Sequence, residues 1–84
     1  MYLQAYSLLD TKTGMYSLPW FMPHEAIALR AAQQLGNDKT TNVGQYPDDF
    51  VLFNIGEFDD NTALMSSFAP RSLGTVGSLL VKKD

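Results

Sequence analysis

The segment from Asp48 to Thr62 constrains the fold more than any other part of the chain. Residues 50–58 are rich in β-branched and aromatic side chains, and acidic turn-forming residues flank them on both sides. This composition predicts a buried strand followed by a tight turn. Apolar side chains alternate onto both faces of that strand, with Phe50, Leu52 and Phe58 on one face and Val51, Phe53 and Ile55 on the other. A single covering layer cannot satisfy both faces, so Phe53 is predicted to be buried by a second layer or a partner.

The size of the chain also favours a partner. A chain of 84 residues buries only roughly 60–65% of its unfolded surface, which leaves a monomer marginally stable. The sequence contains no cysteine and a single histidine, His24, so disulfides and thiolate metal sites are excluded as sources of extra stability. Oligomerisation is the usual alternative, and we expect a homodimer, formed through a sheet face or an edge.

The charge balance argues against strong binding to phosphates. The formal net charge is −3, from six basic and nine acidic side chains, whereas nucleic-acid-binding domains are usually basic. Binding that relies on stacking of bases remains compatible with this charge. Met1 is followed at once by a strand-like run and no long apolar segment occurs, so the sequence predicts a soluble protein without a leader peptide or membrane span.

Taken in order, the chain predicts an α+β domain with the element order ββαββ, a four-stranded antiparallel sheet with one helix packed on one face. Residues 2–9 and 15–21 form a hairpin, residues 23–35 show helical spacing, and strands at 50–58 and 63–68 form a second hairpin that Pro70 ends. A polar loop is expected over 37–47. The single domain is predicted to span residues 1–72, followed by a flexible tail over 73–84.

The first hairpin is predicted to have two faces of different composition. Pairing Leu9 with Met15 gathers the bulky aromatic residues on one face, namely Tyr2, Tyr6, Tyr16 and Trp20. The other face then carries small residues such as Ala5 and Ser7, and we expect the alanine-rich helix to pack on this shallower face.

The carboxylates and the histidine favour structural roles over catalysis. Glu57, Asp59, Asp60 and Asn61 lack the spacing of a calcium loop and are typical of a hairpin turn. The neighbouring Asp48 and Asp49 would point to opposite faces of a strand, and His24 has no nucleophile or orienting carboxylate beside it in a recognisable motif. We therefore predict no enzymatic activity, no metal site and no cofactor.

The aromatic face admits two interpretations. It could be a stacking platform for single-stranded bases, which contributes roughly 1–3 kcal/mol per base and tolerates an acidic protein. It could equally be part of the core or a dimer interface, because a small protein rarely leaves such a face in water. From the residues alone, burial is the preferred interpretation.

Several short segments resemble a known family. They are Leu18–Phe21, Glu25–Arg30, Pro47–Phe53, Gly56–Asp60 and Ser72–Gly74. Together they resemble the small non-structural protein of gokushovirus-type microviruses, which are single-stranded-DNA bacteriophages. The run Asp49–Asp60 is the most specific part. This family often continues the turn as Thr-Gly, where the present sequence has Thr62-Ala63, and its basic C-terminal tail is reduced here to Lys82 and Lys83.

The resemblance implies a function in the host bacterial cytoplasm. It implies binding of single-stranded DNA during genome replication or packaging, and the alternative is a non-enzymatic module that engages a phage or host replication protein. The expected nucleic-acid-binding residues are Lys12, Tyr16, Trp20, Arg30, Arg71, Lys82 and Lys83. Two or three of these cations engaging at once would give a log–log salt slope of about −1.5 to −2 per subunit.

Overall fold

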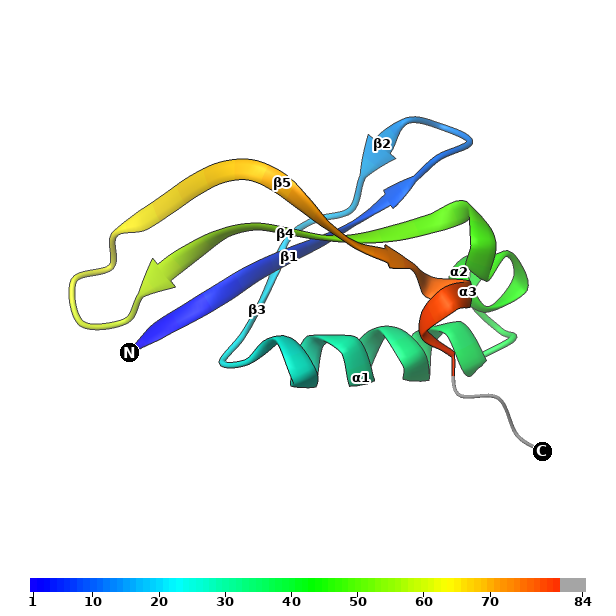
Figure 1. Cartoon of the computed structure of the whole chain (residues 1–84), viewed down its shortest axis with the longest axis horizontal. Coiled ribbons are helices and arrows are strands. Elements are labelled where there is room, and N and C mark those ends of the chain that lie inside the picture. Colours follow the sequence, from blue (N-terminus) through cyan, green and yellow to red (C-terminus); the bar gives the residue numbers. More distant parts are fainter. Residues whose placement is uncertain (81–84) are drawn as a thin grey trace.

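The structure, a computed structural model, describes residues 1–80. A five-stranded antiparallel sheet is built from β1 (Tyr2–Asp10), β2 (Met15–Tyr16), β3 (Trp20–Met22), β4 (Phe50–Asp59) and β5 (Met65–Thr75). The helices are α1 (Glu25–Asn37), α2 (Asn42–Gln45) and α3 (Val76–Leu79), with a 3₁₀ turn, η1 (Pro47–Asp49), before β4. Figure 1 shows α1 lying along one face of the sheet. The predicted α+β class, an antiparallel sheet with a helix on one face, is therefore confirmed.

The sheet has the strand order β2–β1–β4–β5, and β3 also pairs with β1. The return strand of the first hairpin is broken into β2 and β3 over residues 17–19, so the sheet has five strands where four were predicted. Pro19 explains the break because proline cannot donate a ladder hydrogen bond. Ser17 fills part of the gap, since its hydroxyl oxygen accepts a hydrogen bond from the Leu8 backbone N–H at 3.0 Å.

The core lies between α1 and the sheet. Tyr6 and Leu8 from β1, Leu52 from β4 and Val76 from α3 pack against Ala28 and Ala32 of α1, and all are buried. The spacing of Ala28, Ala32 and Gly36 places these small residues on one helix stripe, which lets α1 approach its neighbours closely. Burial of an aliphatic side chain as completely as Leu52 stabilises the fold by roughly 1.5–3 kcal/mol.

The helix packs on the opposite face of the hairpin from the one predicted. Leu9 pairs with Tyr16 rather than with Met15, and a slip of one residue moves a side chain to the other face. Tyr6 and Trp20, which pair across β1 and β3, point toward α1. The prediction that Tyr16 and Trp20 share one face is therefore wrong.

The two sides of β4 also differ from the prediction. Ala5 pairs with Gly56 and Tyr6 with Asn54, so Ile55 is an extra residue in the ladder. This bulge shifts the alternation, and Phe58 consequently lies with Phe53 on the face away from α1. Phe53 is only half-buried there, so the prediction that it is buried is wrong for the chain by itself.

The C-terminal segment belongs to the folded domain. β5 runs past Pro70 to Thr75, which an edge strand tolerates because the missing N–H can face outward. α3 then follows, capped by the Thr75 hydroxyl, which accepts a hydrogen bond from Ser78 N at 3.1 Å. Val76 is fully buried, so the predicted tail is wrong over 73–80; residues 81–84 lie outside the described part. The predicted loop over 37–47 contains the end of α1, α2 and the start of η1.

Candidate nucleic-acid interface

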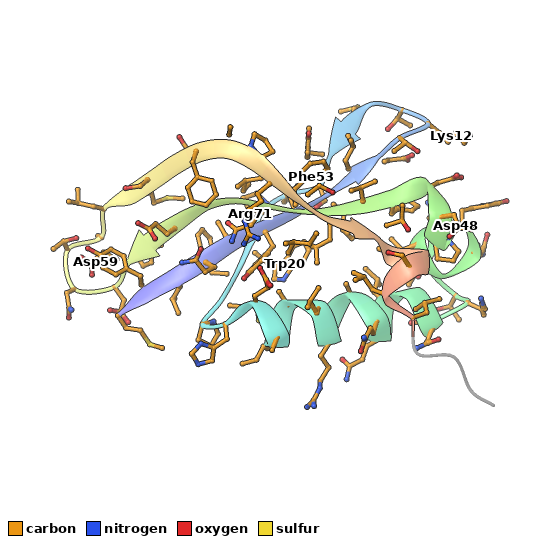
Figure 2. All side chains as sticks on the ribbon, in the orientation of Figure 1. Lys12, Trp20, Asp48, Phe53, Asp59 and Arg71 are labelled. Atoms are coloured by element: carbon orange, nitrogen blue, oxygen red, sulfur yellow. The ribbon has the colours of Figure 1, made fainter. Side chains whose placement is uncertain are left out.

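One face of the sheet has no helix over it among residues 1–80, and we call it the open face. Figure 2 shows Phe53 on this side of the sheet and Trp20 on the other, between the sheet and α1. Strand register assigns the following aromatic and aliphatic residues to the open face: Leu3, Leu9, Tyr16, Phe21, Val51, Phe53, Phe58 and Met65. Ile55 and Phe68 border a hollow on the same side.

Five aromatic side chains dominate the open face. Tyr16 and Phe53 pack edge to face with ring centroids 5.6 Å apart and planes at 67°. Phe21 and Phe58 form a second such pair, at 5.9 Å and 61°. Edge-to-face packing is a favoured geometry worth about 0.5–1.5 kcal/mol per pair, so these contacts favour the observed arrangement of the rings on this face. Tyr16 is 48% exposed, Phe21 37% and Phe68 43%.

Two adjoining hollows run across the open face. The larger, of about 320 Å³, lies between Tyr16 on one side and Phe68 and Pro70 on the other. The smaller, of about 180 Å³, continues past Pro19 and Met65. Ile55 and Ser67 border both hollows. The two together offer an apolar groove with aromatic walls, which is the environment in which planar ligands bind.

Local irregularities in two strands build this groove. Ile55 is the unpaired residue of β4, and three residues of β5, from Phe68 to Pro70, lie opposite it. Gly56 follows the bulge, and a Cβ there would collide with the Ser66 carbonyl oxygen. Glycine therefore permits the close approach of β5 to β4 at this point. The bulge aims Phe58 and Phe68 into the open face, a placement that a regular two-residue alternation in the sequence does not reveal.

The predicted cations within residues 1–80 do not form one patch. Lys12 sits in the turn at the tip of the β1–β2 hairpin (Figure 2), and Arg30 is exposed on α1. Arg71 lies on the α1 side, where its Nη2 donates to Glu25 Oε1 at 2.8 Å. Lys82 and Lys83 lie outside the described residues. By strand register, no charged side chain belongs to the open face within the part of the chain described, and Glu57 borders the smaller hollow.

Trp20 is placed in the core rather than on the open face. Its ring lies 6.1 Å from that of Tyr6, and both pack against the cluster under α1. Burial raises the pKa of the Tyr6 hydroxyl, the Glu25 carboxylate adds to the rise, and Arg71 opposes it. Of the two aromatic residues predicted to bind nucleic acid, the structure puts only Tyr16 on the open face.

The acidic turn residues have hydrogen-bond partners of their own. Asp59 Oδ1 accepts from the backbone N–H of Asn61 at 2.9 Å, which is the turn role expected from the sequence. Asp60 pairs with the Met1 ammonium at 2.8 Å, and this hydrogen bond raises the pKa of that group. Within residues 1–80, no three His, Cys, Asp or Glu side chains lie close enough together to hold a metal ion.

Comparison with known proteins identifies the family. A family model described as phage ORF5 protein matches residues 3–79. The chain belongs to the phage ORF5 protein family. This match spans every helix and strand described above except the first residue of β1, so the whole fold falls within the family and the chain is a phage protein. No curated protein and no solved structure matches. No helix among the described residues of this phage ORF5 family member is long and apolar enough to cross a membrane.

Proposed function

We propose that this phage ORF5 family member is a non-structural microvirus protein that binds single-stranded DNA during genome replication or packaging. It acts in the host bacterial cytoplasm, without enzymatic activity and without a cofactor. Membership in a phage family supports the viral context. The sequence resemblance to the gokushovirus non-structural protein supports the narrower assignment.

One observation carries the proposal: an uncovered sheet face presents aromatic rings around an apolar groove. Tyr16 and Phe68 lie on opposite sides of the larger hollow, and Phe53 packs against Tyr16 through the edge-to-face contact. Proteins that bind single strands place bases on such rings, and each stacked base contributes roughly 1–3 kcal/mol. Splayed bases recognised on an open sheet are also the mode of several RNA-binding modules.

Within residues 1–80, the electrostatic contribution to this binding is small. Lys12 is a cation near the tyrosine end of the open face, whereas Arg71 is engaged by Glu25. Neutralisation of a single phosphate by Lys12 predicts a log–log salt slope of about −0.7 per subunit on single strands. This value is weaker than the slope of about −1.5 to −2 that the sequence suggested from two or three cations. Stacking must therefore supply most of the affinity.

The test compares aromatic variants on opposite faces of the sheet. Fluorescence anisotropy of a labelled pyrimidine oligonucleotide is measured for the unmodified protein, for Tyr16→Ala, for Phe68→Ala and for the control Tyr2→Ala. Tyr2 is 59% exposed and belongs by register to the face opposite Phe53. The open-face variants should weaken binding by roughly 5- to 150-fold, the equivalent of one stacked base, and Tyr2→Ala should not. Absence of binding at about 50 mM salt by a folded sample would overturn the proposal.

A second candidate is a protein-interaction module that engages a phage or host replication protein. The observation that favours it is the lack of charged side chains on the open face within the described residues, which suits an interface core. In that case the oligonucleotide does not bind, and the same Tyr16→Ala and Phe68→Ala variants instead lose association with the purified phage replication protein. Such an apolar contact should change little with added salt.

A further inference from the structure

The two edges of the sheet are very different. β5, with 11 residues, forms one edge and pairs only with β4 among the described strands. The opposite edge consists of β2 and β3, which have two and three residues. An edge strand presents a row of backbone N–H and C=O groups that can pair with another strand. Only β5 is long enough to offer a continuous row.

The first half of β5 lacks the usual protection of an edge. Natural edge strands carry charged residues, prolines or bulges that prevent pairing. Met65–Ala69 contains neither charge nor proline, and all of it is exposed. Protection begins after Ser67, with the irregularity over residues 68–70 opposite Ile55, and continues with Pro70 and Arg71. Exposed apolar side chains lie beside the unpaired backbone groups, since Leu64 is 68% and Met65 65% exposed.

We propose that Met65–Ala69 pairs antiparallel with the same segment of a second copy of this chain, forming a symmetric dimer. In an antiparallel pair of identical strands the two-fold axis is perpendicular to the sheet, so one segment supplies both halves of the contact. The absence of charge matters because each copy carries a net charge of −3, and an uncharged strip lets the copies meet without local repulsion. Pro70 limits the pairing to this short segment because it cannot donate a ladder hydrogen bond.

The dimer has a consequence that rests on the proposed function. A two-fold axis perpendicular to the sheet keeps both open faces on the same side of one continuous ten-stranded sheet, twice the five strands of one copy. The two apolar grooves, each bordered by Ser67 and Phe68 of β5, then lie next to each other across the two-fold axis. A single DNA strand long enough to reach both grooves gains the second at a high effective concentration. An oligonucleotide that spans both grooves should therefore bind at least tenfold more tightly than one that fills a single groove.

Crosslinking tests the position of the contact. The chain has no cysteine, so single cysteines report on their own surroundings. Ser66→Cys and Ser67→Cys are compared with the control Gln34→Cys, an exposed position on α1, under mild oxidation. Opposed residues of an antiparallel pair have Cα atoms roughly 4.5–5.5 Å apart, within the reach of a disulfide. At least one β5 variant should form a disulfide dimer rapidly, and Gln34→Cys should not.

A charge variant tests the same contact without crosslinking. Ser66 pairs with Glu57 of β4, so the lysine of Ser66→Lys has an acidic neighbour within its own copy. In the dimer two such lysines lie on one face as diagonal neighbours across the two-fold axis, where their like charges repel. Light scattering should show the unmodified protein at twice 9.3 kDa, with Ser66→Thr unchanged and the dimer dissociation constant of Ser66→Lys raised at least tenfold. Circular dichroism checks that each variant is folded.

The outcomes separate this inference from the proposed function. A monomer at all accessible concentrations, or a dimer that crosslinks through Tyr16→Cys on the open face and not through β5, would overturn the edge contact. Ser66→Lys should still bind a short oligonucleotide in the larger hollow, which Ser66 does not border, although Ser66 does border the smaller one. Crosslinking at β5 without any DNA binding would support the dimer and contradict the DNA-binding proposal.

Discussion

Two adjacent residues of β4 should respond very differently to truncation. Leu52 faces α1 and is fully buried, whereas Phe53 faces away and is only half-buried. Leu52→Ala removes three buried carbons, which forfeits about 2.4 kcal/mol at roughly 0.8 kcal/mol per carbon, and the cavity left behind brings the total to about 2–5 kcal/mol. A domain of this size has only about 4–13 kcal/mol of stability in all. Leu52→Ala should therefore remove a large part of the free energy of unfolding.

Phe53→Ala removes more atoms but should cost less in the absence of a ligand. Part of the ring is already in contact with water, and the loss includes the edge-to-face contact with Tyr16, which contributes about 0.5–1.5 kcal/mol beyond area burial. We expect a total cost of about 1–2 kcal/mol. At roughly 4–8 °C per kcal/mol, the melting temperature should fall by less than half as much as for Leu52→Ala.

Urea titrations and thermal melts of both variants, followed by circular dichroism at low protein concentration, measure this difference. The low concentration favours the monomer, so that partner contacts do not contribute. An equal or larger loss for Phe53→Ala would show that the α1-covered face has been assigned to the wrong side of β4.

Three further changes test other parts of the fold. Val76→Ala should cost about 2–3 kcal/mol in urea titrations because Val76 is fully buried; a cost near zero would mean that α3 does not pack on the core. Ala63→Gly should raise the melting temperature by several degrees, since Ala63 has φ 63° and a left-handed conformation costs non-glycine residues about 1–2 kcal/mol; a lower melting temperature would contradict this turn geometry. Tyr6→Phe should stabilise the protein at neutral pH, because the Tyr6 hydroxyl is buried without a partner in the described structure. Burial raises the pKa of Tyr6 in the folded protein. The stability linked to the protonated hydroxyl is therefore intact below about pH 10 and is lost as the pH rises toward the folded-state pKa. Tyr6→Phe has no hydroxyl to ionise, so this variant should also lose less stability above pH 10.

The elements of the fold could be predicted from local sequence. The β-branched and aromatic run over residues 50–58 and the alanine-rich helical spacing before Leu35 each specify their element strongly. The turn residues at Asp59–Asn61 also behave as expected, with Asp59 accepting a hydrogen bond from its own turn. These signals depend on neighbours in the chain, and a single sequence contains them.

The assignment of faces could not be predicted, because it depends on register. The pairing of Leu9 with Tyr16 differs by one residue from the predicted pairing, and the bulge at Ile55 reverses the direction of Phe58. Neither feature has a strong local signal, although Gly56 beside the apolar run is typical of a bulge or a close backbone approach. Trp20 therefore shares a face with Tyr6 as predicted, whereas Tyr16, which was predicted on that same face, lies on the other one with Leu9.

The C-terminal segment was missed for a related reason. Val76, Leu79 and Leu80 contact the core, but four residues of helix leave no periodic pattern to detect. Gly36 of α1 contacts this segment, and glycine is needed there because a Cβ would lie 2.6 Å from Val76 Cγ1. A glycine near the end of a helix suggests a C-cap from sequence, whereas here it permits close packing between α1 and α3.

The central claim is that single-stranded DNA stacks on the open face, and ultraviolet crosslinking with peptide mapping tests it most directly. A thymidine oligonucleotide is irradiated with the folded protein, and the crosslinked residues are located by mass spectrometry. Crosslinks should fall on Tyr16, Phe53 or Phe68 and should disappear when an unlabelled single strand competes. Crosslinks confined to α1, or none at all in a sample that retains its circular dichroism spectrum, would contradict the account.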